Sequence, residues 1–267
     1  MYNGPAVDVH AHIYPHKIAD AATESIGEFY QADMQGSTGS TEQLFKLAEP
    51  TPLSHFIVHS VAVKAKNVES INNFIAGEAA KDDRLTGFMA MHQDYENPEA
   101  EIDRAIAAGL KGIKIHPDFQ KVNLDDDKLM RIYEIAEKKH LPLIIHTGDY
   151  RYDYSHPRRM KHVLHEFPNL VVDAAHFGGW SIYDLAVEYM EDEQCFMDIS
   201  SSFAFLGKRR TRELIDIYGT SRIMFGSDFP MWSPKGEFDF FMSLGLSDAQ
   251  CQEILLENPQ RFLGFSL

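Results

Sequence analysis

Histidine is the residue whose placement in this sequence most suggests chemistry. Two of the 13 histidines, His10 and His12, stand two apart in the β-branched stretch VDVHAHIYP near the N-terminus. Side chains two apart in a strand point the same way, so we expect Asp8 to join both histidines on one face, and Val7 and Val9 to take the other. Paired imidazoles can bind a metal ion, but a half-exposed strand with two polar residues explains this stretch equally well.

Further acidic and basic side chains stand at or near the carboxyl ends of later apolar runs. Together with the first pair they are His10, His12, His59, His92, Lys114, His116, His146, His176, Asp198 and Asp228. Three imidazoles and one carboxylate make a good site for zinc or a similar divalent ion, with one position left for water. We therefore predict that His10, His12, His146 and Asp228 bind the ion.

Other members of this set have simpler explanations. We expect His59 and His92 to be hydrogen-bonded histidines inside the fold, because buried polar groups are usually paired. Asp198 is expected to brace neighbouring loops. Arg209, in the stretch GKRRTRE, is expected to be an ordinary charge on a helix surface.

A scaffold must bring these strand ends together. Eight short β-branched runs are predicted to be strands, and they cover residues 6–12, 55–63, 85–92, 112–116, 141–147, 170–176, 195–200 and 222–228. Stretches with helical spacing separate them, among them 125–140, which begins with acids and ends with bases. Such alternation implies parallel strands with right-handed crossovers, and eight units in 267 residues favour a closed (β/α)₈ TIM barrel of the α/β class.

The alternative is an open, doubly wound sheet, which usually carries a glycine-rich phosphate turn after its first strand. The first predicted strand instead runs into HAHIYP, without glycine. We therefore expect one domain over residues 1–267, with an insertion at 14–50. A helix at 17–30 and a mobile turn, QGSTGS, belong to this insertion, which could act as a lid. Ser155 is expected to cap the helix that follows it.

Composition excludes several classes of protein. A net charge of −15 is poorly suited to nucleic acids or anionic membranes. Only two cysteines are present, which excludes a disulfide scaffold, and neither a signal peptide nor a membrane span is recognisable. We expect a cytoplasmic protein that acts on a small molecule. The aromatic residues of GEFDFFMSL are expected to be exposed and could form a homodimer contact.

Several motifs, taken in order, resemble those of the amidohydrolase superfamily. They are DVHAH, GIKIHP, IIHTG, AHFGG, FGSDFP and the closing ENPQRFLGF. The set is most similar to the amidohydrolase-related branch, which holds aminocarboxymuconate-semialdehyde decarboxylase, the resorcylate-type decarboxylases and several lactone hydrolases. The resemblance spans nearly the whole chain, and it is specific for the superfamily but not for the reaction.

The resemblance implies roles for individual residues. His10, His12 and His146 match metal ligands, and Asp228 matches the carboxylate that both binds metal and handles a proton. His176 matches a histidine that acts on the substrate in members with one ion. The KIHP segment also resembles dihydroorotase-type members, in which Lys114 would be carboxylated and bridge two ions, with His146 and His176 on the second. We expect one ion, Zn²⁺ before Mn²⁺.

Three functions compete. The first is hydrolysis of a lactone, amide or related carbonyl compound by metal-activated water, with Asp228 and His176 as catalytic residues. Lys114, His116 and Arg151 are then expected to hold a substrate carboxylate. The second is non-oxidative decarboxylation of a small aromatic or unsaturated acid, with the same residues protonating carbon. The third is a barrel that binds metal and ligand without catalysis, and the complete ligand set argues against it.

Overall fold

The chain folds as strands that alternate with helices. The structure, a computed structural model, describes residues 2–34 and 37–267. The strands in these residues are β1 (Ala6–His12), β2 (Leu53–His59), β3 (Leu85–Ala90), β4 (Gly112–Ile115), β5 (Leu143–Ile145), β6 (Val172–Ala174), β7 (Met197–Asp198) and β8 (Ile223–Met224). The α-helices are α1 (His16–Tyr30), α2 (Thr41–Ala48), α3 (Val68–Ala79), α4 (Pro98–Ala107), α5 (Pro117–Gln120), α6 (Asp127–Lys138), α7 (Pro157–Glu166), α8 (Tyr183–Met190), α9 (Phe203–Tyr218), α10 (Pro234–Met242), α11 (Asp248–Gln252) and α12 (Asn258–Leu263).

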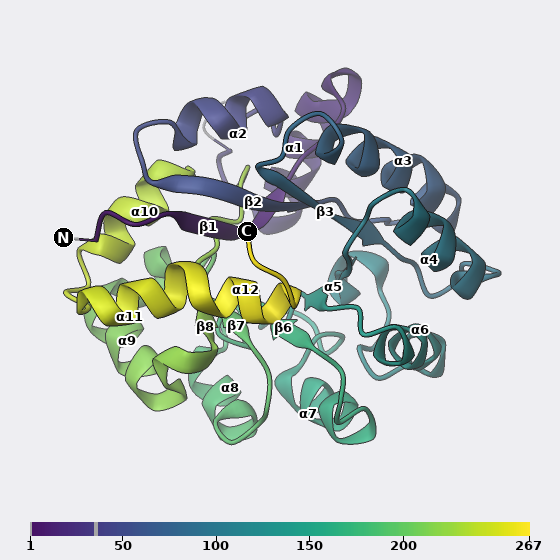
Figure 1. Ribbon diagram of the computed structural model, residues 1–267. Coiled ribbons are helices and arrows are strands. Elements are labelled where there is room, and N and C mark those ends of the chain that lie inside the picture. Colours follow the sequence, from purple (N-terminus) through teal and green to yellow (C-terminus); the bar gives the residue numbers. More distant parts are fainter. Residues whose placement is uncertain (1, 35–36) are drawn as a thin grey trace.

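The strands form a closed parallel barrel, as the sequence predicts. β1 to β6 pair in chain order, and β7 pairs with β8. A parallel bridge between Asp173 and Phe196 joins β6 to β7. The Val9 N–H donates to Phe225 O at 2.9 Å, which brings the end of β8 back to β1. Helices surround this ring in a single domain (Figure 1).

A bulge in β1 overturns the expected alternation of its side chains. Asp8 pairs with Phe56 and Ala11 with Val58, so three steps along β1 match two along β2. One extra residue reverses the inward and outward sides of a strand. Val7 and Val9 therefore do not face the surrounding helices: they pack in a core cluster with Ile57, Phe88, Ile144, Met224 and Phe262. After the bulge, the histidines of β1 point to the same side as these valines.

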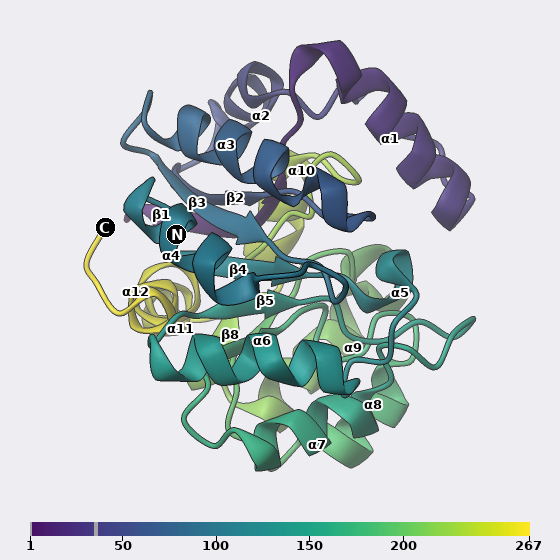
Figure 2. The ribbon, with the colours of Figure 1, turned by 90° about the vertical axis from the view of Figure 1, so that its right-hand side faces the viewer.

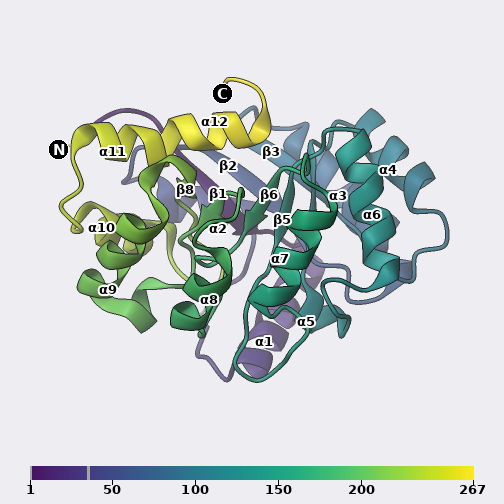
Figure 3. The same cartoon turned by 90° about the horizontal axis from the view of Figure 1, so that it is seen from below.

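The two ends of the barrel differ. Phe262 and Leu263 of α12 pack into the core cluster that holds Val7 and Val9, and so close one end. Figure 2 shows α12 at this end, and α1 and α5 at the other. Figure 3, seen from below, shows the same separation. The loops that follow the strands gather at the end with α1 and α5, which is where functional side chains lie in this architecture.

Of the predictions about short segments, the structure confirms one helix and corrects one helix cap. The helix expected at 17–30 is α1, whereas the mobile turn QGSTGS begins with Gln35 and Gly36, which lie outside the described residues. His156, not Ser155, caps α7: its side chain accepts from the Arg158 N–H. The Ser155 hydroxyl instead donates to Asp118, so it is committed to a buried carboxylate. In the described part of the chain, no helix is long and apolar enough to cross a membrane.

The aromatic residues of GEFDFFMSL are not the exposed surface that we expected for a dimer contact. Phe238 and Phe241 are buried in the core. Phe240 is half-buried, and its ring stacks on Phe203 of α9 at 4.4 Å. Helix α10 therefore uses these rings to pack within the domain.

Candidate active site

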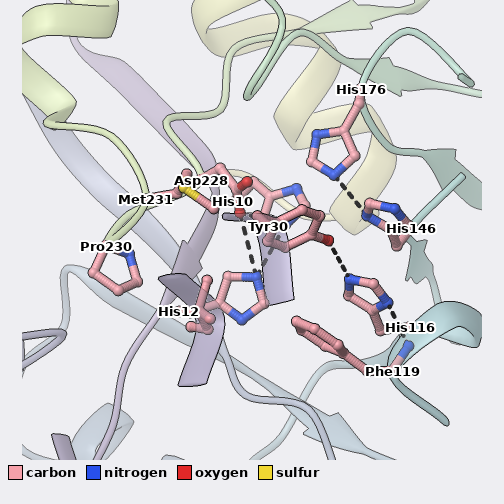
Figure 4. Close-up of a pocket in the computed structure, with 11 residues that line it drawn as sticks. His10, His12, Tyr30, His116, Phe119, His146, His176, Asp228, Pro230 and Met231 are labelled. Carbon is pink, nitrogen blue, oxygen red and sulfur yellow. Dashed lines mark hydrogen bonds and ion pairs between the residues drawn. The ribbon is translucent and has the colours of Figure 1, made fainter. Parts of the chain in front are cut away.

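A small cavity opens among the residues that follow the strands. It is lined by His10, His12, Ile26, Tyr30, His116, Phe119, His146, His176, Asp228, Pro230 and Met231 (Figure 4). The structure thus brings together all four predicted ligands and the predicted catalytic His176. Ile26 and Tyr30 come from α1, so the insertion after β1 does reach over the mouth.

Three predicted ligand atoms converge at 3.3 to 3.4 Å. His10 Nε2 lies 3.3 Å from His12 Nε2, and Asp228 Oδ1 lies 3.4 Å from each of them. Ligands bound tetrahedrally at about 2.0–2.1 Å stand roughly 3.3–3.4 Å apart, so these separations fit one divalent ion. We call His10, His12 and Asp228 the β1/β8 cluster.

The proton on His10 is fixed on the far side of its ring. Its Nδ1 donates to Asp198 Oδ2 at 2.7 Å, in the manner of a carboxylate that orients a metal-binding histidine. Burial and the nearby Lys114 ammonium lower the pKa of His10 to about 4, so the ring is neutral and Nε2 keeps its lone pair. Asp198 also accepts from Ser200 and from the His176 N–H, which bears out its expected bracing role.

His146 pairs with His176 rather than with the β1/β8 cluster. Its Nε2 lies 2.9 Å from Gly148 O, to which it donates, and its Nδ1 lies 3.0 Å from His176 Nε2. His176 Nδ1 in turn lies 2.9 Å from Ser200 O. In the tautomer in which each outer nitrogen donates to its carbonyl oxygen, both inner nitrogens keep a lone pair for a metal ion, whereas without an ion one inner nitrogen can donate to the other. We call His146 and His176 the β5/β6 cluster.

Lys114 lies beneath the cavity rather than in its wall. Its side chain is buried, and Nζ donates to His10 Nε2 at 2.8 Å. Burial lowers the pKa of Lys114 to about 8, although Asp228 and Asp198 oppose the shift. For the carboxyl of Asp228, burial alone would raise the pKa, but the adjacent imidazoles of His10, His176 and His12 outweigh burial and hold it below its usual range.

The structure does not place Arg151 at the cavity. Its guanidinium binds both carboxylate oxygens of Asp149, at 2.9 and 2.6 Å, and donates to Phe29 O. The guanidinium carbon, Cζ, also lies 4.5 Å from the centre of the Phe29 ring. Arg151 therefore links the C-terminal end of α1 to the loop after β5 through hydrogen bonds. Because its donors are used in these bonds, it is not available to hold a substrate carboxylate as we expected.

His116 does line the cavity, and it reveals a residue that the sequence did not suggest. Its Nδ1 accepts from the Phe119 N–H, so in the neutral ring Nε2 carries the proton and donates to the Tyr30 hydroxyl oxygen at 3.0 Å. The Tyr30 proton is thereby left free to donate into the cavity. Burial raises the pKa of Tyr30 well above its ordinary value, which keeps the hydroxyl protonated.

The two histidines assigned to the interior differ. His92 is hydrogen-bonded as expected, because its Nδ1 accepts from the Asp94 N–H at 3.1 Å. His59 is fully buried, yet neither of its ring nitrogens has a partner among the described residues, so the expected hydrogen bonds are absent. Its ring stands edge-on to that of His12 at 4.5 Å, and burial holds its pKa well below the ordinary value.

Two site residues hold unusual backbone conformations. His176 has a φ of 61° and Asp228 a φ of 56°, in the left-handed region that side chains other than glycine rarely adopt. Their N–H groups donate to Asp198 Oδ1 and to His10 O respectively, which fixes both turns. Such strain, of order 1–3 kcal/mol per residue, is typical of functional sites.

Comparison with solved structures identifies the same architecture. The fold is similar to that of 2,6-dihydroxybenzoate decarboxylase in complex with 2,6-dihydroxybenzoate, with a TM-score of 0.76 and 18% identity over 98% of this chain and 100% of the other. It is also similar to a dihydroxybenzoic acid decarboxylase from Polaromonas sp. JS666 with bound manganese and the inhibitor 2-nitroresorcinol. The TM-score is 0.76, with 14% identity over 98% of this chain and 97% of the other. A third similar structure is that of a putative 2-pyrone-4,6-dicarboxylic acid hydrolase from Pseudomonas putida, with a TM-score of 0.68 and 16% identity over 99% of each chain.

At these identities the likeness establishes the barrel and leaves the reaction open. The sequence itself is more specific, because residues 7–265 match the amidohydrolase family. Its buried histidine and aspartate groups also form a site suited to a divalent cation. Since the match covers nearly the whole chain, the protein belongs to the amidohydrolase family and is an enzyme.

Proposed function

We propose that the protein is a metal-dependent hydrolase of a small ester, lactone or amide. The observation that carries this proposal is the convergence of His10 Nε2, His12 Nε2 and Asp228 Oδ1 within 3.4 Å on the cavity floor. A divalent ion held there would lower the pKa of a bound water and polarise a carbonyl group. Nitrogen-rich ligands favour Zn²⁺, with Mn²⁺ as the alternative.

We further propose that the site takes two ions, the arrangement that the KIHP resemblance implies. The β5/β6 cluster supports this, because His146 Nδ1 and His176 Nε2 lie 3.0 Å apart, and both can offer a lone pair to an ion when their outer nitrogens carry the protons. Lys114 Nζ lies 2.8 Å from His10 Nε2, where a carboxylated lysine could contact the β1/β8 cluster. This replaces our expectation of a single ion bound by both His10 and His146.

The residues around the cavity have complementary tasks in hydrolysis. Asp228 Oδ2 accepts from the Ser201 hydroxyl at 2.5 Å, which fixes the carboxylate so that it can take a proton from the attacking water. The Tyr30 hydroxyl is oriented by His116 and can donate to the oxygen that gains charge during attack. Tyr30 therefore joins Asp228 as a candidate catalytic residue.

The charge of the lining bears on the substrate. Among the described residues that line the cavity, none is Lys or Arg. Arg151 is engaged by Asp149, and Lys114 lies below the floor. No basic side chain of the described lining is therefore available to hold the substrate carboxylate that we expected from the sequence.

Decarboxylation is the second candidate, and one observation favours it. Ile26, Phe119 and Met231 give part of the cavity lining an apolar character, and a substrate carboxylate beside such side chains would lose hydration and release CO₂ more easily.

The test is product chemistry with metal-loaded protein. Panels of lactones, amides and carboxylated aromatics are incubated in water enriched in oxygen-18. We expect the heavy isotope in the acid product, without release of CO₂. Release of CO₂ with no isotope incorporated would establish the lyase instead, and a Tyr30→Phe variant would show whether the same cavity is responsible.

A further inference from the structure

A second hollow lies beside the catalytic cavity and is much larger. It is a groove of about 650 Å³ between α1 and the segment that runs from β2 into α3. Figure 2 shows α1 projecting from the barrel next to α3. The groove and the catalytic cavity share Ile26 and Phe119 in their linings, so the two spaces adjoin at these side chains.

The groove is lined for an apolar occupant. From α1 it receives Ile18, Ala22, Ile26 and Phe29, which stand three or four residues apart and so form one helix face. No Asp or Glu is among its described lining residues, although the chain has a net charge of −15. Lys121 is its one charged lining residue in the described chain.

Part of this surface is left uncovered. Ile18 and Val63, on opposite walls of the groove, are 52% and 51% exposed. Contiguous apolar surface of this kind marks a binding site more often than an ordinary protein surface. Because the groove adjoins the catalytic cavity at Ile26 and Phe119, a molecule whose reactive end lies in that cavity can place its remainder in the groove.

We propose that the groove binds the apolar tail of the substrate, so that the substrate is an ester, lactone or amide with an alkyl chain. The inference rests on the proposed hydrolase function, since it places the carbonyl head between the β1/β8 cluster and Tyr30. The tail then passes Ile26 and Phe119 and lies between Ile18 and Val63. In this arrangement the small cavity binds the carbonyl head of the substrate, and the larger groove binds its alkyl chain.

The test is a series of alkyl hydroxamates, whose heads bind divalent metal and whose tails differ only in length. Binding of acetohydroxamate, hexanohydroxamate and decanohydroxamate to the metal-loaded protein is measured by calorimetry. We expect affinity to rise about two- to fourfold per added methylene, the effect of burying a CH₂ group. Ile18→Glu and Val63→Glu should abolish this increment and leave acetohydroxamate binding unchanged.

Ile106→Glu is the matched control, because Ile106 is an exposed apolar residue of α4 outside the groove. Acetohydroxamate bound with no gain from longer tails would overturn the groove inference alone. Failure of acetohydroxamate to bind would overturn the hydrolase proposal, and the groove inference with it. A flat series together with a wild-type dimer that Ile18→Glu converts to monomer would identify the groove as a contact between copies of the chain, and would also overturn the inference.

Discussion

The β1/β8 and β5/β6 clusters are built on the same plan. In each, a histidine donates its outer proton to a fixed oxygen: His10 to Asp198, His146 to Gly148 O and His176 to Ser200 O. In each, the inner ligand atoms lie within 3.4 Å of one another. Orientation by an outer hydrogen bond is what metal-binding histidines require.

The clusters differ in charge. The β1/β8 cluster contains the carboxylate of Asp228, and its outer partner, Asp198, is a second carboxylate. The β5/β6 cluster has only imidazoles, oriented by backbone carbonyls. Negative charge near the ligands favours a cation in a buried site. We therefore predict that the β1/β8 cluster binds the first divalent ion and binds it more tightly than the β5/β6 cluster binds a second.

The largest effect is expected from removing the β1/β8 cluster. His10→Ala combined with His12→Ala takes away two of its three ligand atoms and should abolish tightly held metal and all metal-dependent turnover. Elemental analysis of protein purified without chelator provides the measurement. Full metal occupancy in this double variant would show that the cluster is not the primary site.

A variant without His176 tests the β5/β6 cluster separately from the β1/β8 cluster. His176→Asn should reduce the metal content from about two ions per chain to about one, since the β1/β8 cluster is intact. Turnover should fall as well, because the second ion loses one of its two imidazole ligands. Metal titration by calorimetry would give the stoichiometry.

The exposed His162 supplies the control for this variant, because its side chain is 52% exposed on α7. His162→Asn should leave stoichiometry and turnover unchanged. A wild-type content of one ion per chain, preserved in His176→Asn, would contradict the two-ion proposal and restore the arrangement that we expected from the sequence.

A smaller effect is expected from the outer partner of His10. Asp198→Asn keeps the shape of the side chain but weakens its hold on the Nδ1 proton, so affinity for the first ion should fall by about 10–100-fold. Binding at the β5/β6 cluster should change little. Competition with a chelator measures the difference, and Asp184→Asn, at an exposed carboxylate, is the control. An equal loss of affinity for both ions would show that Asp198 stabilises both clusters rather than the β1/β8 cluster alone.

Much of the fold could be predicted because it depends on local patterns. The alternation of β-branched and amphipathic segments predicts the barrel, and polar side chains at the ends of strands predict the position of the site. The bulge in β1 could not be predicted, because its cause is pairing with β2 rather than the sequence of β1 itself. The strict period of two therefore assigned Val7 and Val9 to the wrong side.

The site was only partly predictable for a related reason. His10, His12 and Asp228 meet because β1 and β8 are neighbours in a closed barrel. The partners of His146 and Arg151, however, depend on side-chain directions and on loops: Gly148 O binds the first, and Asp149 binds the second. Tyr30 was missed because it comes from the insertion, where no motif distinguishes it.

One buried carboxyl outside the cavity lining, that of Glu237, senses the charge of Asp228 in the β1/β8 cluster. Glu237 of α10 is 8% exposed, and its Oε2 has no partner among the described residues. Burial, with the charges of Asp228 and Asp8, raises its pKa to about 8. Because the folded pKa lies above the unfolded value, Glu237 binds its proton more tightly in the folded state. Its contribution to stability is therefore present at low pH and is lost as pH rises toward and through 8.

Glu237→Gln removes this titration while keeping the shape of the side chain. Relative to wild type, the variant should gain on the order of 2–4 kcal/mol in unfolding free energy between about pH 5 and pH 9. Urea unfolding at a series of pH values measures the gain, and Glu188→Gln, at an exposed position of α8, should show none. A gain that disappears in Asp228→Asn would show that the charge of the β1/β8 cluster, more than burial, sets the state of Glu237. A gain that persists would assign the effect to burial and confine that cluster's influence to the cavity.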